Sequence, residues 1–339
     1  MGSKNVAIVG ATGAVGESML ELLESRKFPV DNLYLLASER SAGSRLSFAE
    51  RNIRVENLAD FDFGQVDIAL FSAGGSVSAE FAPKAAAAGC VVIDNTSYFR
   101  RDPEIPLIIP EVNLHRLPDY VNKNIIANPN CSTIQMLVAL KPIYDAVGIS
   151  RIHVSTYQAV SGAGKSGVEE LAGQTARLLN VQSIESRVFP AQIAFNAIPA
   201  IGEFEENGFT IEEMKMIWET HKIFEDDSIQ VSPTCVRIPV FYGHSEAVYI
   251  ETRKSISAET ARQLFADFPG IEVVDDVKAD IYPTAVAQAA GSDPVYVGRI
   301  RKDVANELGL HCWVVSDNVR KGAALNSVQI AEHLIEQLL

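Results

Sequence analysis

The fold is decided near the start of the chain by the stretch Val6-Ala7-Ile8-Val9-Gly10-Ala11-Thr12-Gly13-Ala14-Val15-Gly16. An apolar run typical of a buried strand passes into a glycine-rich turn, and Glu17–Ser25 then carries apolar residues at helical spacing. Glycines in such a turn let backbone N–H groups approach a pyrophosphate, and a helix N-terminus adds partial positive charge beside it. The spacing is GxxGxxG rather than GxGxxG, but the position between a first strand and a first helix is the required context. We therefore expect a dinucleotide here, against the alternative of a turn without a ligand, at Gly10, Thr12, Gly13, Ala14, Val15 and Gly16.

The remainder of the first 130 residues alternates short apolar segments with helical ones. Strands that alternate with helices and are buried on both faces imply a parallel, doubly wound sheet. The fold class is therefore α/β, with an N-terminal Rossmann-type domain. The expected strands are Val6–Val9, Asn32–Leu36, Ile68–Phe71, Val91–Asp94 and Asn124–Ala127, and the expected helices are Glu17–Ser25 and Ser78–Ala88.

The pattern changes near Cys131, where a helix over Ser132–Val147, with a bend expected at Pro142, leads into longer alternating segments. Alternation of apolar and polar residues indicates a mostly antiparallel sheet with one buried face, as in an α+β domain. Its expected strands are Ile152–Val160, Thr234–Pro239 and Ala247–Thr252, and its expected helix is Thr210–Phe224, which starts with a capping box of Thr210 and Glu213. We expect one domain of residues 1–131 plus a returning C-terminal helix of about residues 318–339, and a second domain of residues 132–317.

Composition and charge exclude several classes of function. The 339 residues are 47% hydrophobic and 21% charged, which is ordinary globular composition. The formal net charge of −14 argues against general binding to nucleic acid or to anionic membranes, because like charges repel. Four cysteines lie far apart without a CxxC pair, so neither a disulfide framework nor a metal site is expected. We see no signal peptide and no apolar run of roughly 20 residues, and therefore expect a cytoplasmic protein.

The end of the second strand indicates which dinucleotide binds. An NAD-dependent enzyme usually places a carboxylate there, on the ribose 2′-hydroxyl. This chain reads Ser38-Glu39-Arg40-Ser41, in which the serines can donate hydrogen bonds and Arg40 can pair with a 2′-phosphate. Glu39 argues for NAD, but it lies one step beyond the strand end, so we predict NADP. A second small-residue loop after the third strand is also expected at the cofactor, through Ser72, Ala73 and Gly74.

The segment Asn128-Pro129-Asn130-Cys131-Ser132-Thr133 is expected to form a tight turn between a strand and a helix. A cysteine at a helix N-terminus lies beside the helix dipole and beside N–H groups without intrahelical partners, and both favour the thiolate. The same N–H groups, with the Asn130 side chain, can hold the oxyanion that forms when sulfur attacks a carbonyl. We therefore predict that Cys131 is a nucleophile, whereas Cys90, Cys235 and Cys312 are expected to be small buried apolar residues.

A thiol nucleophile needs a base, and six histidines are available: His115, His153, His221, His244, His311 and His333. Sequence position alone does not choose among them. His244 differs from the others because Arg237 lies seven residues before it, on a strand–turn–strand segment where both can face one cleft. The arginine would clamp a carboxylate, and the histidine would relay a proton.

Together these residues resemble the aspartate-β-semialdehyde dehydrogenase family along essentially the whole chain. The matching segments are residues 10–16, 36–41, 94–100, 128–133, 157–164, 212–215, 235–239, 243–245 and 316–324. The resemblance implies a reversible, NADPH-dependent conversion of L-aspartyl-4-phosphate to L-aspartate-4-semialdehyde and inorganic phosphate, in the synthesis of lysine or diaminopimelate, threonine, methionine and isoleucine. It also implies a homodimer that packs through the second domain.

The resemblance further implies roles for individual residues. Cys131 would attack the aldehyde carbon and carry an acyl-thioester, while His244 takes up the proton and Gln158 orients the substrate. Arg237 would grip the α-carboxylate and Glu212 the ammonium group. The other implied residues are Asn130 at the substrate, Arg100 and Lys215 at the phosphate, and Ser161, Gly162 and Asn318 at the nicotinamide end of the cofactor.

Alternatives exist for the function and for single residues. N-acetyl-γ-glutamyl-phosphate reductase shares the mechanism, but its motif typically reads Asn-Pro-Gly-Cys-Tyr, whereas this chain has Asn128-Pro-Asn-Cys-Ser132. A catalytically silent, NADP-binding paralogue should have lost its nucleophile or its base, and neither is missing here. Glu212 and Lys215 could instead form an exposed salt-bridged helix face, and Arg100 could be a solvated surface charge.

Overall fold

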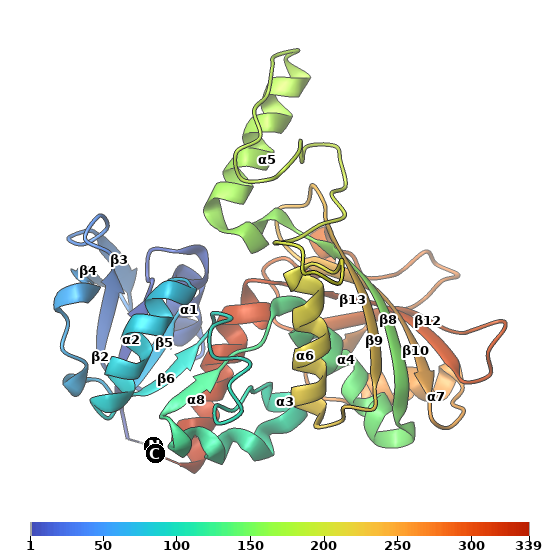
Figure 1. Cartoon of the computed structure of the whole chain (residues 1–339), viewed down its shortest axis with the longest axis horizontal. Helices are drawn as coiled ribbons and strands as arrows, with labels where there is room; N and C mark the ends of the chain where they lie inside the picture. The colour runs from blue at the N-terminus through green and yellow to red at the C-terminus, as the bar shows by residue number, and fades with distance from the viewer. Residues whose placement is uncertain (1, 339) are drawn as a thin grey trace. The chain divides into compact units, whose positions relative to one another are not determined.

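The computed structural model describes residues 2–338, which form two compact units. The first unit contains residues 2–130 together with residues 323–338, and the second contains residues 131–322. The last helix of the chain, coloured red in Figure 1, therefore belongs to the same unit as the first strand.

A seven-stranded sheet forms the centre of the first unit, in the order β3-β4-β2-β1-β5-β6-β7. Every neighbouring pair is parallel except the β3-β4 hairpin at one edge, so the predicted doubly wound sheet is confirmed. The strands are β1 (Lys4–Val9), β2 (Val30–Ala37), β3 (Arg45–Phe48), β4 (Arg51–Asn57), β5 (Ile68–Phe71), β6 (Val91–Asp94) and β7 (Ile125–Ala127). The helices are α1 (Ala14–Ser25), α2 (Gly75–Ala87), α3 (Pro110–Asn113) and α8 (Leu325–Gln337).

Apolar side chains from two helices cover the strands of this sheet. Met19 of α1 and Val328 of α8 are fully buried in one cluster with Ile8 and Leu70 of the central strands. Each such side chain contributes roughly 1.5–3 kcal/mol when it leaves water. The five predicted strands and the three predicted helices of this unit, the C-terminal one included, are all present. The β3-β4 hairpin was not predicted, because its two strands carry many polar and exposed residues.

Six strands make the sheet of the second unit, in the order β11-β12-β13-β10-β8-β9. The central pairs are antiparallel and the two outermost pairs are parallel, which confirms the prediction of a mostly antiparallel sheet. The strands are β8 (Ile149–Gln158), β9 (Gln230–Arg237), β10 (His244–Thr252), β11 (Ile271–Val273), β12 (Val295–Lys302) and β13 (Gly309–Ser316). The helices are α4 (Cys131–Val147), α5 (Gly164–Leu179), α6 (Ile211–Phe224) and α7 (Ala258–Ala266).

Helix α5 and the segment that follows it extend away from the six-stranded sheet (Figure 1). Helix α6 begins with the predicted capping box, in which the N–H of Thr210 donates to Glu213 Oε2 at 2.7 Å and the N–H of Glu213 donates to Thr210 Oγ1 at 3.3 Å. Helix α4 runs unbroken through Pro142. Helices α5 and α7 and strands β11, β12 and β13 were not predicted.

Candidate active site

Three of the residues predicted at the substrate lie at one edge of the six-stranded sheet. Arg237 is the last residue of β9 and Gln158 is the last residue of β8, and the two are paired directly. His244 begins β10, where the pairing of Ser245 with Tyr157 places it beside Gln158. Side chains in one row of a sheet point to the same face, so these three lie together. All three residues are buried, with 7%, 1% and 0% of Arg237, Gln158 and His244 exposed.

The backbone of Ala159 connects two members of this row. Its N–H donates a 3.0 Å hydrogen bond to Nδ1 of His244, and its carbonyl oxygen accepts a 2.7 Å hydrogen bond from Nη1 of Arg237. Gly162 lies beside this junction, where a Cβ atom would be 2.8 Å from Arg237 Nη1 and 3.5 Å from His244 Nε2. A side chain at position 162 would therefore displace the guanidinium group.

Burial controls the charge of the imidazole. His244 is wholly enclosed, and the loss of solvation, followed by the positive charge of Arg237, lowers its pKa to about 3. The negative charge of Glu212 acts in the opposite direction but is the smallest of the three effects. The ring is therefore neutral at pH 7, and its Nε2 atom has no hydrogen-bond partner among residues 2–338.

Helix α6 places Glu212 and Lys215 beside the row of buried side chains at the sheet edge. Gln158 Nε2 donates to Glu212 Oε1 at 3.3 Å, and Lys215 Nζ lies 3.1 Å from Glu212 Oε2. Only 6% of Glu212 is exposed, so the pair is not a solvated helix face. Burial lowers the pKa of Arg237, and the charge of Glu212 partly opposes that effect. Glu212 therefore contacts both Gln158 and Lys215, and its charge acts on Arg237.

Cys131 is the first residue of α4 and is only partly buried, whereas the other three cysteines are buried. Burial raises the pKa of Cys90 and of Cys312 to about 12, and it raises the pKa of Cys235 as well. These three thiols stay protonated, as expected for small buried apolar residues. The charge of a Cys131 thiolate acts on Arg237 and raises the pKa of the guanidinium group, so the sulfur belongs to the same group of side chains.

Two residues predicted at the nicotinamide fix the loop that leads into β10. The Asn318 side chain accepts a 2.9 Å hydrogen bond from the N–H of Gly243 and donates a 3.0 Å hydrogen bond to Ser161 Oγ. Gly243 adopts a φ of +89°, which favours glycine. Ser161 and Asn318 are both buried and bond each other. Ser161 precedes Gly162 in the chain, and Gly243, which Asn318 holds, precedes His244.

The first unit has a cavity of about 560 Å³ at the carboxyl ends of β1, β2 and β5. Helix α1 begins there, and its N-cap residue is Gly13, which has no side chain to cap the first N–H groups. That arrangement fits a pyrophosphate, since uncapped N–H groups at a helix N-terminus bind anions. The predicted cofactor residues that line the cavity are Gly10, Thr12, Gly13, Ser38, Ser72 and Ala73.

Other residues that were predicted to bind the cofactor do not line this cavity. A Cβ atom on Gly16 would be 2.2 Å from the Gly10 carbonyl oxygen, so Gly16 serves the close packing of α1 on the turn. Arg40 lies in the exposed turn that follows β2. The remaining predicted residues outside the wall are Ala14, Val15, Ser41 and Gly74. Sequence reasoning missed the lining residues Asn57, Leu58, Ala59, Val77 and Phe81, and β4, which would have indicated Asn57, was not predicted.

Arg100 is held inside the first unit by backbone carbonyl groups. Its Nε donates to the carbonyl oxygen of Asn128 and its Nη2 donates to that of Asn95, both at 2.8 Å. The side chains of these two asparagines are joined by a 3.0 Å hydrogen bond. Only 8% of Arg100 is exposed, so it is not a solvated surface charge, and it braces the turn that ends at the buried Asn130.

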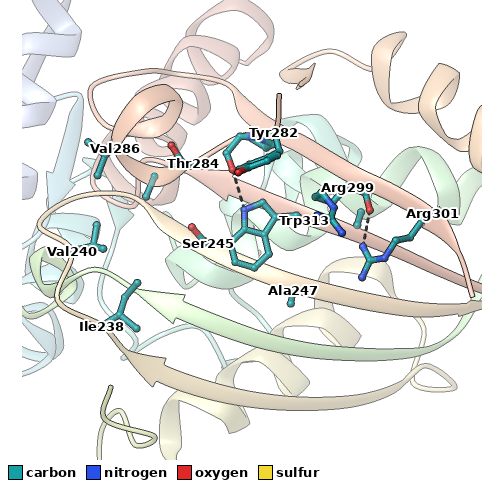
Figure 2. Close-up of a pocket in the computed structure, with 13 residues that line it drawn as sticks. Ile238, Val240, Ser245, Ala247, Tyr282, Thr284, Val286, Arg299, Arg301 and Trp313 are labelled. Carbon is teal, nitrogen blue, oxygen red and sulfur yellow. Dashed lines mark hydrogen bonds between the residues drawn. The ribbon is translucent and has the colours of Figure 1, made fainter. Parts of the chain in front are cut away.

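The opposite face of the six-stranded sheet carries a second cavity of about 560 Å³, shown in Figure 2. Ser245 and Ala247 line it, because they alternate along β10 with the inward-facing His244. Trp313 lies among them, and its Nε1 donates a 3.1 Å hydrogen bond to the carbonyl oxygen of Pro283. None of the predicted site residues lines this cavity.

Two features are absent from residues 2–338. No helix there combines the length and the apolar character that a bilayer crossing requires. The same residues contain no group of three His, Cys, Asp or Glu side chains arranged to hold a metal ion.

A Rossmann-type unit followed by a unit with a clustered cysteine, histidine and arginine defines a two-domain, dinucleotide-dependent dehydrogenase. Residues 5–120 match the NAD binding domain of semialdehyde dehydrogenases, and residues 140–321 match the semialdehyde dehydrogenase dimerisation domain. The chain belongs to the aspartate-semialdehyde dehydrogenase family.

Individual relatives span the whole chain. Aspartate-semialdehyde dehydrogenase 2 of Vibrio cholerae is 62% identical over 98% of this chain and 97% of that protein. The Bacillus subtilis aspartate-semialdehyde dehydrogenase is 52% identical over 97% of both. A crystal structure of aspartate semialdehyde dehydrogenase II from Vibrio cholerae, complexed with ASA, is 60% identical, covers 100% of both chains and superposes with a TM-score of 0.98.

Proposed function

We propose that this chain catalyses the reversible, NADPH-dependent reductive dephosphorylation of L-aspartyl-4-phosphate to L-aspartate-4-semialdehyde and inorganic phosphate. The observation that carries the proposal is the group in the second unit: a partly exposed cysteine at a helix N-terminus, coupled to a buried row of Arg237, Gln158 and His244. The family supports the class of substrate.

Cys131 is the nucleophile of the oxidative direction. Its thiolate adds to the aldehyde carbon, and the N–H groups at the start of α4, with the Asn130 side chain, stabilise the charge that develops on the substrate oxygen. Bound NADP⁺ supplies a nicotinamide ring that accepts the hydride leaving this carbon. Cys131 then carries the acyl group as a thioester until phosphate attacks the carbonyl carbon and releases the thiolate.

The buried charges select an amino-acid substrate. Arg237 is proposed to clamp the α-carboxylate and Glu212 to receive the ammonium group, while Gln158 orients the reacting end. An N-acetylated substrate has no ammonium group, and it would leave the carboxylate of Glu212 without its cationic partner. The chemistry of the site thus favours the aspartyl substrate over the N-acetylglutamyl one.

Phosphate and cofactor are assigned to further residues. Lys215 and Arg100 are proposed as the cations that receive phosphate, whose dianion an acidic protein must attract locally. NADP is proposed as the cofactor, with its pyrophosphate at residues 10–16 and its 2′-phosphate near residues 38–41. Ser161, Gly162 and Asn318 are proposed at its nicotinamide end.

One assay tests this function: NADP reduction with aspartate semialdehyde, with and without phosphate, compared with the N-acetylglutamate analogue. Cys131→Ser should abolish phosphate-dependent reduction while the protein stays folded, and Cys312→Ser, which changes a buried thiol, is the matched control. Appreciable turnover by Cys131→Ser would exclude the thioester, and a preference for the N-acetylated substrate would favour the reductase alternative.

A second copy of this chain is the proposed occupant of the outer face of the six-stranded sheet. The matched dimerisation domain spans this sheet, and its outer cavity is walled mainly by apolar side chains such as Val240, Ala247 and Trp313. We therefore propose a homodimer in which the two copies pack through their second units.

A further inference from the structure

The segment between α5 and α6 packs against Arg237. The guanidinium carbon of Arg237 lies over the ring of Phe189, 5.9 Å from the ring centroid. The backbone of Arg237 is paired with Ile198 of the same segment, because its N–H donates to the Ile198 carbonyl oxygen at 2.8 Å and its carbonyl oxygen accepts from the Ile198 N–H at 2.9 Å. Residues 189–198 therefore contact Arg237 through one aromatic side chain and through one pair of backbone hydrogen bonds.

The ring of Phe189 suits a buried cation. A guanidinium group is attracted to the face of an aromatic ring when it lies within about 6 Å of the ring centroid, and the attraction is stronger where water is excluded. Both residues are buried, with 8% of Phe189 and 7% of Arg237 exposed. Loss of solvation lowers the pKa of Arg237, so burial opposes the charge of the guanidinium group. The negative face of the ring offsets part of that lost solvation.

Two contacts hold the guanidinium plane from different sides. The carbonyl oxygen of Ala159 accepts a 2.7 Å hydrogen bond from Nη1 of Arg237, which fixes an edge of the plane. The Phe189 ring covers a face of the same plane. A bidentate pair with a carboxylate requires the two planar groups to align, so the orientation of the guanidinium group decides whether the pair can form.

A carboxylate of α5 fixes the backbone that carries Phe189. Glu170 Oε2 accepts from the N–H of Arg187 at 2.9 Å and from that of Val188 at 2.6 Å. Its Oε1 accepts from the N–H of Phe189 at 3.4 Å. Gly167 lies on the same helix, and a Cβ atom there would be 3.2 Å from Phe189 Cζ, so α5 also packs directly on the ring. Helix α5 therefore sets the position of Phe189.

Gln174 supports the segment at a second point. It is buried, and its Oε1 accepts from the N–H of Ile193 at 2.9 Å and from that of Ala194 at 3.2 Å. Its Nε2 donates to Glu170 Oε1 at 3.2 Å. Residues four apart lie on one face of a helix, so this pair presents a continuous polar surface to the segment. Satisfied buried hydrogen bonds of this kind give a loop one defined conformation.

We propose that Phe189 is a positioning residue for Arg237, and that its ring holds the guanidinium plane in the orientation that clamps the substrate α-carboxylate. This inference rests on the proposed function, in which Arg237 binds that carboxylate. Phe189 acts through Arg237, while Glu170 and Gln174 act through the backbone that carries Phe189. The segment between α5 and α6 thereby contributes to substrate selection.

Phe189→Leu tests this role, because leucine keeps a buried apolar side chain but removes the aromatic face. We expect the KM for aspartate semialdehyde to rise about tenfold, kcat to change less than about twofold, and the KM values for NADP and phosphate to stay unchanged. Phe189→Tyr retains the ring and should bring the KM for aspartate semialdehyde back near the wild-type value. Phe195→Leu is the matched control, since Phe195 is 66% exposed on the same segment, and it should leave all constants unchanged.

A double-mutant cycle distinguishes positioning from a general structural role. Lysine at position 237 has no plane to orient, so Phe189→Leu added to Arg237→Lys should raise the KM by less than about twofold further. A full tenfold rise in that background, a rise shared by the KM values for NADP and phosphate, or an unchanged KM in Phe189→Leu alone would overturn the inference. A wild-type chain that does not reduce NADP with aspartate semialdehyde would instead refute the proposed function, and this inference with it.

Discussion

A Cβ atom on Gly322 would lie 2.8 Å from the Cβ atom of Cys131. Gly322 is part of a π-helical turn, η6 (Arg320–Ala324), and its lack of a side chain lets this turn pack directly on the first residue of α4. Close packing of this kind leaves no space for even one added methyl group without a shift. The position of Cys131, the proposed nucleophile, therefore depends on a glycine far away in sequence.

Gly322→Ala should fold but displace Cys131, and a shift of about 1 Å at a reacting group can cost roughly 100-fold in rate. Steady-state kinetics together with thermal unfolding will measure the two effects separately. Gly173→Ala in α5 is the matched control, since its Cβ meets nothing within 4 Å, and it should keep full activity. Full activity in Gly322→Ala would show that this contact does not place the sulfur.

Arg237→Lys should lower kcat/KM for aspartate semialdehyde by about 100-fold, chiefly through KM, despite the retained positive charge. A lysine cannot keep the bond to the Ala159 carbonyl oxygen and also form a bidentate pair with a carboxylate. Arg54→Lys, on exposed strand β4 of the other unit, serves as the control. Unchanged kinetic constants would remove Arg237 from the substrate site.

NADP should be used more efficiently than NAD, and Ser38→Asp should reverse this order. Ser38 lines the cavity of the first unit, where a carboxylate would bind a ribose 2′-hydroxyl and repel a 2′-phosphate. Arg40→Ala should weaken NADP binding alone, and the kcat/KM values for both cofactors measure each effect. Equal wild-type efficiency with both cofactors would refute the assignment of residues 38–41.

Glu246 should make the protein less stable as pH rises. This carboxyl is fully buried under α4, and desolvation raises its pKa well above the ordinary value, with a smaller opposing contribution from Gln135. The folded chain therefore keeps a proton that the unfolded chain releases above about pH 4.3, and stability falls by up to about 1.4 kcal/mol per pH unit until the folded-state pKa is reached.

Glu246→Gln keeps the shape of the side chain without an ionisable group. Its free energy of unfolding, measured in urea from pH 5 to 8, should fall less steeply with pH than that of the wild type. Glu272→Gln, at an exposed position on β11, should reproduce the wild-type slope. Identical slopes in all three proteins would mean that Glu246 ionises in the folded state much as it does in the unfolded one.

Ala247→Arg should convert the dimer to a monomer. Ala247 is half-buried on the wall of the apolar outer cavity, where an added charge would have to be desolvated on association. Light scattering after size exclusion gives the mass of each species. Val304→Arg, fully exposed and outside that cavity, should stay dimeric, and a dimeric Ala247→Arg would place the interface elsewhere.

The sequence predicted the features that depend on short stretches of chain. The strand, glycine turn and helix of residues 4–25 formed as expected, because apolar spacing and glycine act between near neighbours. The capping box of Thr210 and Glu213 is likewise a local pattern. Cys131 was expected at a helix start for the same reason, and α4 begins at that residue.

The features that depend on strand register and burial could be seen only in the tertiary structure. The spacing of Arg237 and His244 indicated that both can face one cleft, but no spacing showed that β8 lies between β9 and β10 and adds Gln158 to the same row. Register is set by pairing between distant segments. No local pattern placed the N–H of Ala159 against Nδ1 of His244 either. The sequence by itself determined most of the strands and helices of the first unit and the place of Cys131, the proposed nucleophile, at a helix start. The fold determined the charge of His244, since desolvation and the charge of Arg237 act through space.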